Sequence, residues 1–202
     1  TKMKKIITLI FLQYCLYGLD LENISFQKKW NILQNNPVKI EWLYHEGFPI
    51  IRASKVCNHS MHSLAELILD LENYPNIFKR VTSSEIMSSN VVHITLDMPF
   101  PFAIRDYIVR FNIEKNDSSW TFSYSSVKEG VSDPKPGYVR LNDAAGIWKL
   151  KRISQSNTLV TYTWNGQLLG NFPDFGLEKA WLTQGNEVFY WLTSALAKRK
   201  NL

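Results

Sequence analysis

Alternating apolar and polar residues predict at least five strands between residues 81 and 164. Strict alternation gives each strand one buried face and one face in water, which is typical of an antiparallel sheet. Asn, Asp, Gly and Pro residues suited to turns separate the strands. The alternating stretches are 92–98, 107–113, 120–124, 148–151 and 160–164.

One of these strands places a cation among apolar residues. Tyr107 and Val109 share a face of the strand, and counting back two residues puts Arg105 on the same face. A buried guanidinium is costly unless it meets an internal carboxylate, backbone carbonyls, water or a ligand. Pro99 and Pro101 lack the donor for ladder hydrogen bonds, so they mark an edge or bend where the sheet opens. An open sheet with a buried charge indicates a pocket.

Two further strands and a helix are expected before this sheet. The ranges 38–45 and 48–57 flank the turn-forming pair Glu46-Gly47, which together predict a hairpin. An amphipathic pattern over 21–33 predicts a helix upstream of the hairpin.

Amphipathic helices are also expected at 60–73 and at 174–197. Ser60 is a favourable N-cap for the first, whose apolar residues recur at spacings of three and four. The second has a broad apolar stripe that contains one polar residue, Gln184. In a pocket the amide of Gln184 would bind a ligand oxygen, and on a partly exposed helix it would need no ligand.

The order of several short motifs resembles that of the StAR-related lipid-transfer (START) domains. The resemblance covers residues 25–197 and departs from the family at Phe78, where Trp is usual. The pieces, in the family's order, are Leu67-Ile68-Leu69-Asp70 with Tyr74-Pro75, Pro99-Phe100-Pro101 followed by Arg105-Asp106-Tyr107-Ile108, Gly137-Tyr138-Val139-Arg140, Gly146-Ile147-Trp148-Lys149-Leu150, Thr161-Tyr162-Thr163-Trp164 and Gly170-Asn171-Phe172-Pro173.

The resemblance, to a bacterial-type exported member of the START-like superfamily, implies an α+β helix-grip fold. In that fold a curved antiparallel sheet wraps around the long C-terminal helix and leaves a cavity, of about 300 to 1,000 Å³ if it holds a small ligand. We therefore expect the chain to bind, and to carry, a lipid or another hydrophobic small molecule, with transient membrane contact and without a cofactor. The candidate ligand-binding residues are Arg105, Tyr107, Val109, Phe111, Trp120, Phe122, Tyr124, Trp148, Tyr162, Trp164, Gln184, Val188 and Trp191.

Two other classes of function stay open at this point. A cyclase or hydrolase on the same scaffold would need an acid or base in the pocket, and by side-chain face the candidates are Arg105, Tyr107, Tyr124 and Tyr162. The sequence has no nucleophile elbow, no phosphate-binding glycine loop and no histidine pair at a metal-ligand spacing with a third ligand, so a binding protein is favoured. The third class is an interaction protein whose tryptophans fill the core.

The first 18 residues are typical of an export signal. Lys2, Lys4 and Lys5 precede an apolar segment too short to span a membrane core of about 30 Å comfortably. The alternatives are cleavage after Gly18, acylation of Cys15 as in lipoproteins, and a retained anchor. The expected product is a periplasmic, secreted or membrane-tethered protein with one START-like domain over 21–202.

Removal of that segment changes what charge and cysteine content indicate. Its three lysines account for most of the net charge of +5 and leave +2, so the basic balance is no evidence for a nucleic-acid partner. Cys57 would then be without a disulfide partner in the chain unless Cys15 is retained. A buried, unreactive thiol is the favoured interpretation of Cys57.

Overall fold

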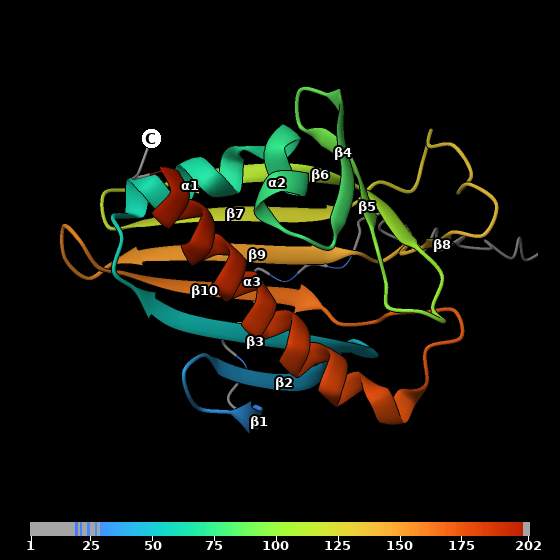
Figure 1. The fold of residues 1–202 in the computed structure, drawn as a ribbon, viewed down its shortest axis with the longest axis horizontal. Coiled ribbons are helices and arrows are strands. Elements are labelled where there is room, and N and C mark those ends of the chain that lie inside the picture. The colour runs from blue at the N-terminus through green and yellow to red at the C-terminus, as the bar shows by residue number, and fades with distance from the viewer. Residues whose placement is uncertain (1–18, 20, 22–23, 25–26, 28, 200–202) are drawn as a thin grey trace, which may run out of the picture.

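A computed structural model describes residues 19, 21, 24, 27 and 29–199 of this 202-residue chain. Within the described part, ten strands form one sheet in the order β1-β2-β3-β10-β9-β7-β6-β5-β4, with β8 paired to β6. The long helix α3 (Leu177–Arg199) lies diagonally across one face of the sheet (Figure 1). The α+β helix-grip architecture expected from the sequence is confirmed. The proposed signal at residues 1–18 lies outside the described residues.

The strands pair antiparallel throughout, except for the short β8, which runs parallel to the start of β6. Each predicted alternating stretch falls within one strand, apart from 92–98, whose last two residues lie beyond β5. The strands are β1 (Asn31–Gln34), β2 (Lys39–His45), β3 (Phe48–Cys57), β4 (Val81–Ser88), β5 (Val91–Leu96), β6 (Arg105–Lys115), β7 (Ser119–Ser126), β8 (Val139–Arg140), β9 (Ala145–Arg152) and β10 (Thr158–Asn165).

The hairpin between β2 and β3 forms as the turn residues predict. Glu46 and Gly47 both have positive φ, at 51° and 83°. Two consecutive left-handed residues match the right-handed twist of the flanking strands, which is why two-residue hairpin loops favour this geometry. The hairpin places β2 next to the edge strand β1 and β3 next to β10.

The helix predicted over 21–33 is wrong in its last five residues, and several residues of its first half lie outside the described part of the chain. Residues Asn31–Gln34 form the edge strand β1, in which Asn31 pairs with Trp42 of β2. The free edge of β2 offers a ladder of backbone hydrogen bonds, and this tertiary contact outweighs a weak helical periodicity. Leu21 and Ile24 are buried instead against Leu43, Ile50 and Ala145, on the face of the sheet opposite α3.

The helix predicted over 60–73 is interrupted after its second turn. The Ser60 hydroxyl accepts the backbone N–H of Ser63 at 3.1 Å, so the expected N-cap is confirmed. Asp70 has non-helical backbone angles (φ −80°, ψ 60°), which end the first helix and redirect the chain. The resulting elements are α1 (Met61–Leu69), the 3₁₀ turn η2 (Leu71–Asn73) and α2 (Tyr74–Ile77).

The last helix packs closely against the β2–β3 side of the sheet. The chain enters it through the 3₁₀ turn η3 (Asp174–Gly176), close to the predicted start. Gly185 allows the close approach, because a Cβ there would lie 2.8 Å from Cδ1 of Ile40. Trp181, Phe189 and Leu192 of α3 are buried in the same cluster as the inner face of the sheet. With α3 held close at β2 and β3, space remains between the helix and strands β6, β7 and β9.

Candidate functional site

A cavity of about 550 Å³ lies between the inner face of the sheet and α3. Its volume is within the range of about 300 to 1,000 Å³ that is usual for small-molecule sites. Strands β6, β7, β9 and β10 form one wall and α3 forms the other, and apolar and aromatic side chains make up most of the lining. The site therefore suits a mainly hydrophobic molecule.

Seven of the thirteen candidate residues named from the sequence line this cavity. Trp148 and Tyr162 stack with ring centroids 4.1 Å apart, and they form a flat aromatic surface on the sheet side. The residues that the structure brings together here are Tyr107, Tyr124, Trp148, Tyr162, Gln184, Val188 and Trp191. Strand parity and the helical stripe located them correctly on the inner faces of their elements.

The other six candidates lie elsewhere. Val109, Phe111 and Phe122 face inward as predicted but are packed in the hydrophobic core. Trp120 packs at the edge of that core, with its ring 6.0 Å from the ring of His62. Trp164 lines a side chamber of about 60 Å³ that adjoins the cavity. Arg105, the sixth, is described next.

Arg105 is buried as its strand parity predicts, with 1% of its surface exposed. Its guanidinium donates three hydrogen bonds to backbone carbonyls, to Leu168 at 3.1 Å, to Leu169 at 2.9 Å and to Ala103. Burial lowers the pKa of Arg105 from its ordinary value. Among the described residues, those that line the cavity do not include Arg105. The sequence left four kinds of partner open for Arg105, namely a carboxylate, backbone carbonyls, water or a ligand. In the structure the partners are backbone carbonyls.

These contacts join two loops at one end of the cavity, the loop of residues 97–104 and the loop of residues 166–173. Figure 1 shows both loops near the start of α3. The rings of Phe102 and Phe172, one from each loop, lie 4.6 Å apart. Phe102 and Phe172 also line the cavity, as does Leu168. We call residues 97–104 and 166–173 the mouth loops.

The candidate residues named from the sequence do not include the lining contributed by the mouth loops, by α2 and by the residues next to them. Loops have no apolar periodicity, so the positions that face a cavity cannot be found from spacing. The prolines of the mouth loops and the pair Tyr74-Pro75 belong to the family motifs, but a motif does not show which of its side chains face a cavity. The lining residues missed include Tyr74, Phe78, Leu96, Met98, Phe102, Leu168, Phe172 and Phe175.

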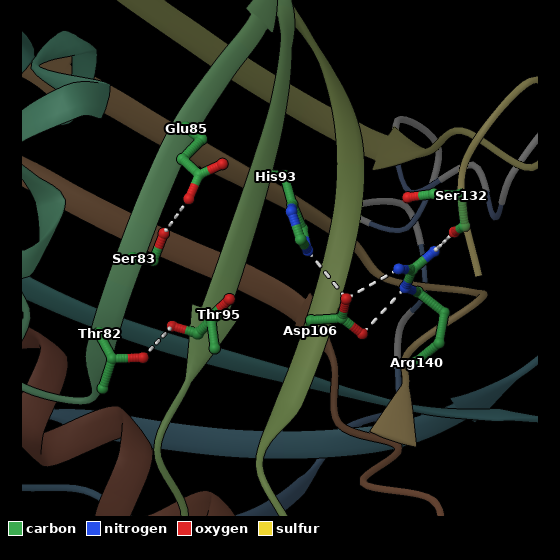
Figure 2. Close-up of polar contacts among 8 residues, drawn as sticks. All are labelled: Thr82, Ser83, Glu85, His93, Thr95, Asp106, Ser132 and Arg140. Carbon is green, nitrogen blue, oxygen red and sulfur yellow. Dashed lines mark hydrogen bonds and ion pairs between the residues drawn. The ribbon is translucent and has the colours of Figure 1, made fainter. Parts of the chain in front are cut away.

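Asp106 faces away from Arg105 and is paired on the outer side of the sheet. Figure 2 shows its carboxylate between Arg140 and His93. Arg140 donates to both carboxylate oxygens at 2.9 and 2.8 Å, and Nε2 of His93 lies 2.8 Å from Oδ2. Burial opposes ionisation of Asp106, but the hydrogen bonds and charges of Arg140 and His93 outweigh it, so its pKa is below the ordinary value. Arg140 also donates to the Ser132 carbonyl, which ties the 127–138 segment to β6.

Two tyrosines from strands that are not neighbours meet on the cavity wall. The hydroxyl oxygens of Tyr124 (β7) and Tyr162 (β10) lie 2.6 Å apart, across the intervening strand β9. Gly146 of β9 makes this contact geometrically possible, because a Cβ there would overlap the Tyr124 ring. Burial raises the pKa of Tyr124, and it raises the pKa of Tyr162 to about 12 although the hydrogen bond between the two hydroxyls lowers the latter. Both phenols are therefore neutral at physiological pH.

The remaining chemistry of the described residues is sparse. Cys57 is buried and unpaired among them, as expected, and burial raises the pKa of its thiol to about 11 despite the nearby Lys55. No group of three or more His, Cys, Asp and Glu side chains within the described ranges is arranged to hold a metal ion. None of the helices in that part of the chain is both long and apolar enough to cross a membrane.

Several solved structures share this fold. A STAR-related lipid transfer protein from Xanthomonas axonopodis (fragment 25–204) is 19% identical, with a TM-score of 0.73, and the match covers 84% of this chain and 99% of that one. Human STARD10 is 17% identical, with a TM-score of 0.76 and coverage of 90% and 81%. Human StAR-related lipid transfer protein 5 is 14% identical, with a TM-score of 0.72 and coverage of 88% and 92%.

The ZhuI aromatase/cyclase from Streptomyces sp. R1128 is more distant, at 12% identity and a TM-score of 0.53, with coverage of 74% of this chain and 94% of that one. No family model and no curated protein matches the chain. At these identities the comparisons establish the fold. The chain has the START-like fold that the motifs indicated, a fold with room for a hydrophobic ligand between sheet and helix.

Proposed function

We propose that this protein binds a lipid or another hydrophobic small molecule in the cavity between the sheet and α3, and carries it between membranes. The observation that supports this most directly is the cavity itself, of about 550 Å³ and with a mainly aromatic and aliphatic lining. A cavity of this size favours ligand binding over the alternative of a core filled by the protein's own tryptophans. Affinity would come from apolar ligand area removed from water, at about 25 cal/mol per Å².

Exchange of the ligand would take place at the mouth loops. Phe100 is 97% exposed and Phe175 is 93% exposed, and both belong to the end of the molecule where the mouth loops meet α3. Exposed phenylalanines next to the opening of an apolar cavity are suited to insertion into a lipid bilayer. A ligand that leaves the cavity there would enter the bilayer without crossing water.

Binding is favoured over catalysis by the state of the polar groups in the cavity. A general base must lose its proton near the working pH, whereas burial raises the pKa of Tyr107, Tyr124 and Tyr162. His93 is paired with Asp106 on the outer side of the sheet. The similarity to an aromatase/cyclase extends only to the fold.

A substitution that fills the cavity tests the proposal. Val188 lines the cavity and is 8% exposed, so in Val188→Trp the indole would take the space of the ligand. We expect binding of the neutral dye Nile red to weaken at least tenfold, with the free energy of unfolding changed by less than about 1 kcal/mol because an existing void is filled. Lipids extracted from the purified wild-type protein, identified by mass spectrometry, should be absent from the variant.

The matched control is Tyr190→Trp, which adds an indole on the exposed side of the same helix, where Tyr190 is 66% exposed. This control should bind Nile red like the wild type. Unchanged dye binding in Val188→Trp would show that the ligand is not held in this cavity.

A further inference from the structure

Four polar side chains meet on the cavity walls where the main cavity joins the side chamber. Tyr107 of β6, Tyr124 of β7 and Tyr162 of β10 come from the sheet, and Gln184 comes from α3 on the opposite side. All four line both spaces. We call them the tyrosine–glutamine group. They are a polar site within a mainly apolar lining.

The hydrogen-bonding capacity of this group is only partly used. In the Tyr124–Tyr162 pair one hydroxyl donates to the other, so the second hydroxyl keeps a proton for which the described residues provide no acceptor. Within the same part of the chain, no protein partner lies within hydrogen-bond distance of the Tyr107 hydroxyl or the Gln184 amide. Tyr74 also lines the cavity but differs, because its hydroxyl donates to the Ile68 carbonyl at 2.7 Å. The cavity wall thus presents several free donors at one place.

The charges near the group are neutralised or directed elsewhere. Arg80, which lines the cavity, is held by Glu187 through two hydrogen bonds of 2.6 and 2.8 Å. Asp97 and Lys179 lie at the exposed margin and have opposite signs. Arg105 is bound to backbone carbonyls. A carboxylate or phosphate at the tyrosine–glutamine group would therefore lose its hydration without gaining a counter-charge, which disfavours an anion.

We propose that the tyrosine–glutamine group binds an uncharged oxygen of the ligand, a hydroxyl or a carbonyl, and that the cavity thereby selects neutral lipids over anionic ones. The ligand oxygen accepts the free tyrosine protons and the Gln184 amide N–H, and a ligand hydroxyl donates to the Gln184 carbonyl. The hydrocarbon part of the ligand lies along Trp148, Val188 and Trp191. This inference rests on the proposed function, since it assumes that the cavity holds the ligand.

The test compares three probes that have the same sixteen-carbon chain, namely hexadecanol, hexadecane and hexadecanesulfonate, as competitors of bound Nile red. Each hydrogen bond gained in the cavity strengthens binding by roughly two- to tenfold. We therefore expect hexadecanol to compete about tenfold better than hexadecane, and the permanently charged sulfonate to compete least.

The decisive variant is Tyr124→Phe/Tyr162→Phe, which removes both hydroxyls and keeps both rings. It should weaken the preference for hexadecanol, because only Tyr107 and Gln184 then remain to bind the oxygen, and it should bind hexadecane like the wild type. Tyr74→Phe is the matched control, because its hydroxyl is already committed to Ile68, and the preference for hexadecanol should persist there. Tyr107→Phe serves as a second variant if thermal melting shows that the double variant does not fold.

The outcomes separate this inference from the proposed function. Equal competition by hexadecanol and hexadecane in the wild type, or stronger competition by the sulfonate, would overturn the inference and leave cavity binding intact. A preference for hexadecanol that is undiminished in both Tyr124→Phe/Tyr162→Phe and Tyr107→Phe would also overturn it. If no probe displaces Nile red and Val188→Trp still binds the dye, the proposed function itself fails.

Discussion

Arg105 and Asp106 are neighbours in the chain and both are 1% exposed, yet they are satisfied in different ways. Successive residues of a strand face opposite sides of the sheet. Arg105 therefore meets backbone carbonyls of the mouth loops on the inner side, and Asp106 meets Arg140 and His93 on the outer side. The contacts of Arg105 hold the mouth loops against the start of β6, and the contact of Asp106 with Arg140 holds the 127–138 segment there.

At Arg105 we predict a structural cost without a change of ligand. Arg105→Met keeps the length of the side chain but leaves the carbonyls of Ala103, Leu168 and Leu169 without this donor and removes a buried guanidinium, so the free energy of unfolding should fall by about 3 kcal/mol. Denaturant titration measures this loss, and the control Arg152→Met removes an exposed arginine and should be nearly neutral. The ranking of the three sixteen-carbon probes should stay the same. Intact stability together with a changed ranking would instead place the guanidinium on the ligand.

At Asp106 we predict a stability difference that depends on pH. Its pKa is below the ordinary 3.8 in the folded chain, so the stabilisation is complete above that value and is lost as the pH falls through the folded pKa. Asp106→Asn should cost about 3 kcal/mol at pH 7, because Arg140 loses its partner. The deficit should shrink in strong acid, where the wild type is protonated as well.

The control for this variant is Asp143→Asn, which breaks a half-exposed pair with Lys128 and should cost less than about 1 kcal/mol. Thermal melting of all three proteins between pH 7 and pH 2.5 provides the comparison. A deficit for Asp106→Asn that is constant over this range would contradict the assigned charge on Asp106.

At the scale of the elements, Gly146 allows side chains of β7 and β10 to meet across β9 on the cavity wall. Gly146 lies opposite Tyr124 on one neighbouring strand and opposite Trp164 on the other. Without a side chain at that position, the Tyr124 ring crosses over β9 and its hydroxyl reaches Tyr162. The polar site of the cavity thus depends on a position that contributes no side chain to it.

Gly146→Ala should break this arrangement. The added methyl group overlaps the Tyr124 ring, and we expect a loss of about 1 to 3 kcal/mol in the free energy of unfolding, together with weaker binding of hexadecanol. A double-mutant cycle with Tyr124→Ala is the control, since the clash disappears when the ring is removed. Additive effects in that cycle would show that the two residues are not coupled through the contact seen here.

At the scale of the whole molecule, exposed aromatic side chains of the mouth loops and of η3 lie at one end of the cavity. Phe100 and Phe175 are almost fully exposed, while Phe102 and Phe172 contact each other and line the cavity. This end of the molecule therefore combines exposed aromatic side chains with two loops that the hydrogen bonds of Arg105 connect. Under the proposed function, this end would dock on a bilayer while a ligand enters or leaves.

We predict that Phe100→Ser/Phe175→Ser slows transfer of ligand between phosphatidylcholine vesicles by at least tenfold, because each phenylalanine buried in the bilayer contributes about 1.5 to 3 kcal/mol. Binding of Nile red in solution should change little, because Phe100 does not line the cavity and Phe175, although part of the lining, is 93% exposed. Tyr190→Ser, at an exposed site further along α3, is the control. A transfer rate equal to that of the wild type would rule out this end as the docking surface.

The sequence by itself determined the elements in which periodicity is strong. Alternation located the central strands and the buried side of Arg105, and the helical stripe located Gln184, Val188 and Trp191 on the inner side of α3. These features follow from local repeats of two and 3.6 residues, which are visible without a fold. The ordered motifs then indicated the topology, which the structure confirms.

Only the tertiary structure decided which strands pair and which distant side chains are in contact. Residues 31–34 became an edge strand because β2 offered a free ladder, against a helical periodicity. Arg105 donates to the carbonyls of Leu168 and Leu169, more than sixty residues away in the chain. The contact between Tyr124 and Tyr162 crosses β9 at Gly146. The inward faces of β6 and β7 divide into cavity wall at Tyr107 and Tyr124 and packed core at Val109 and Phe122. Distances between elements arise from packing over the whole chain, so no local pattern encodes them.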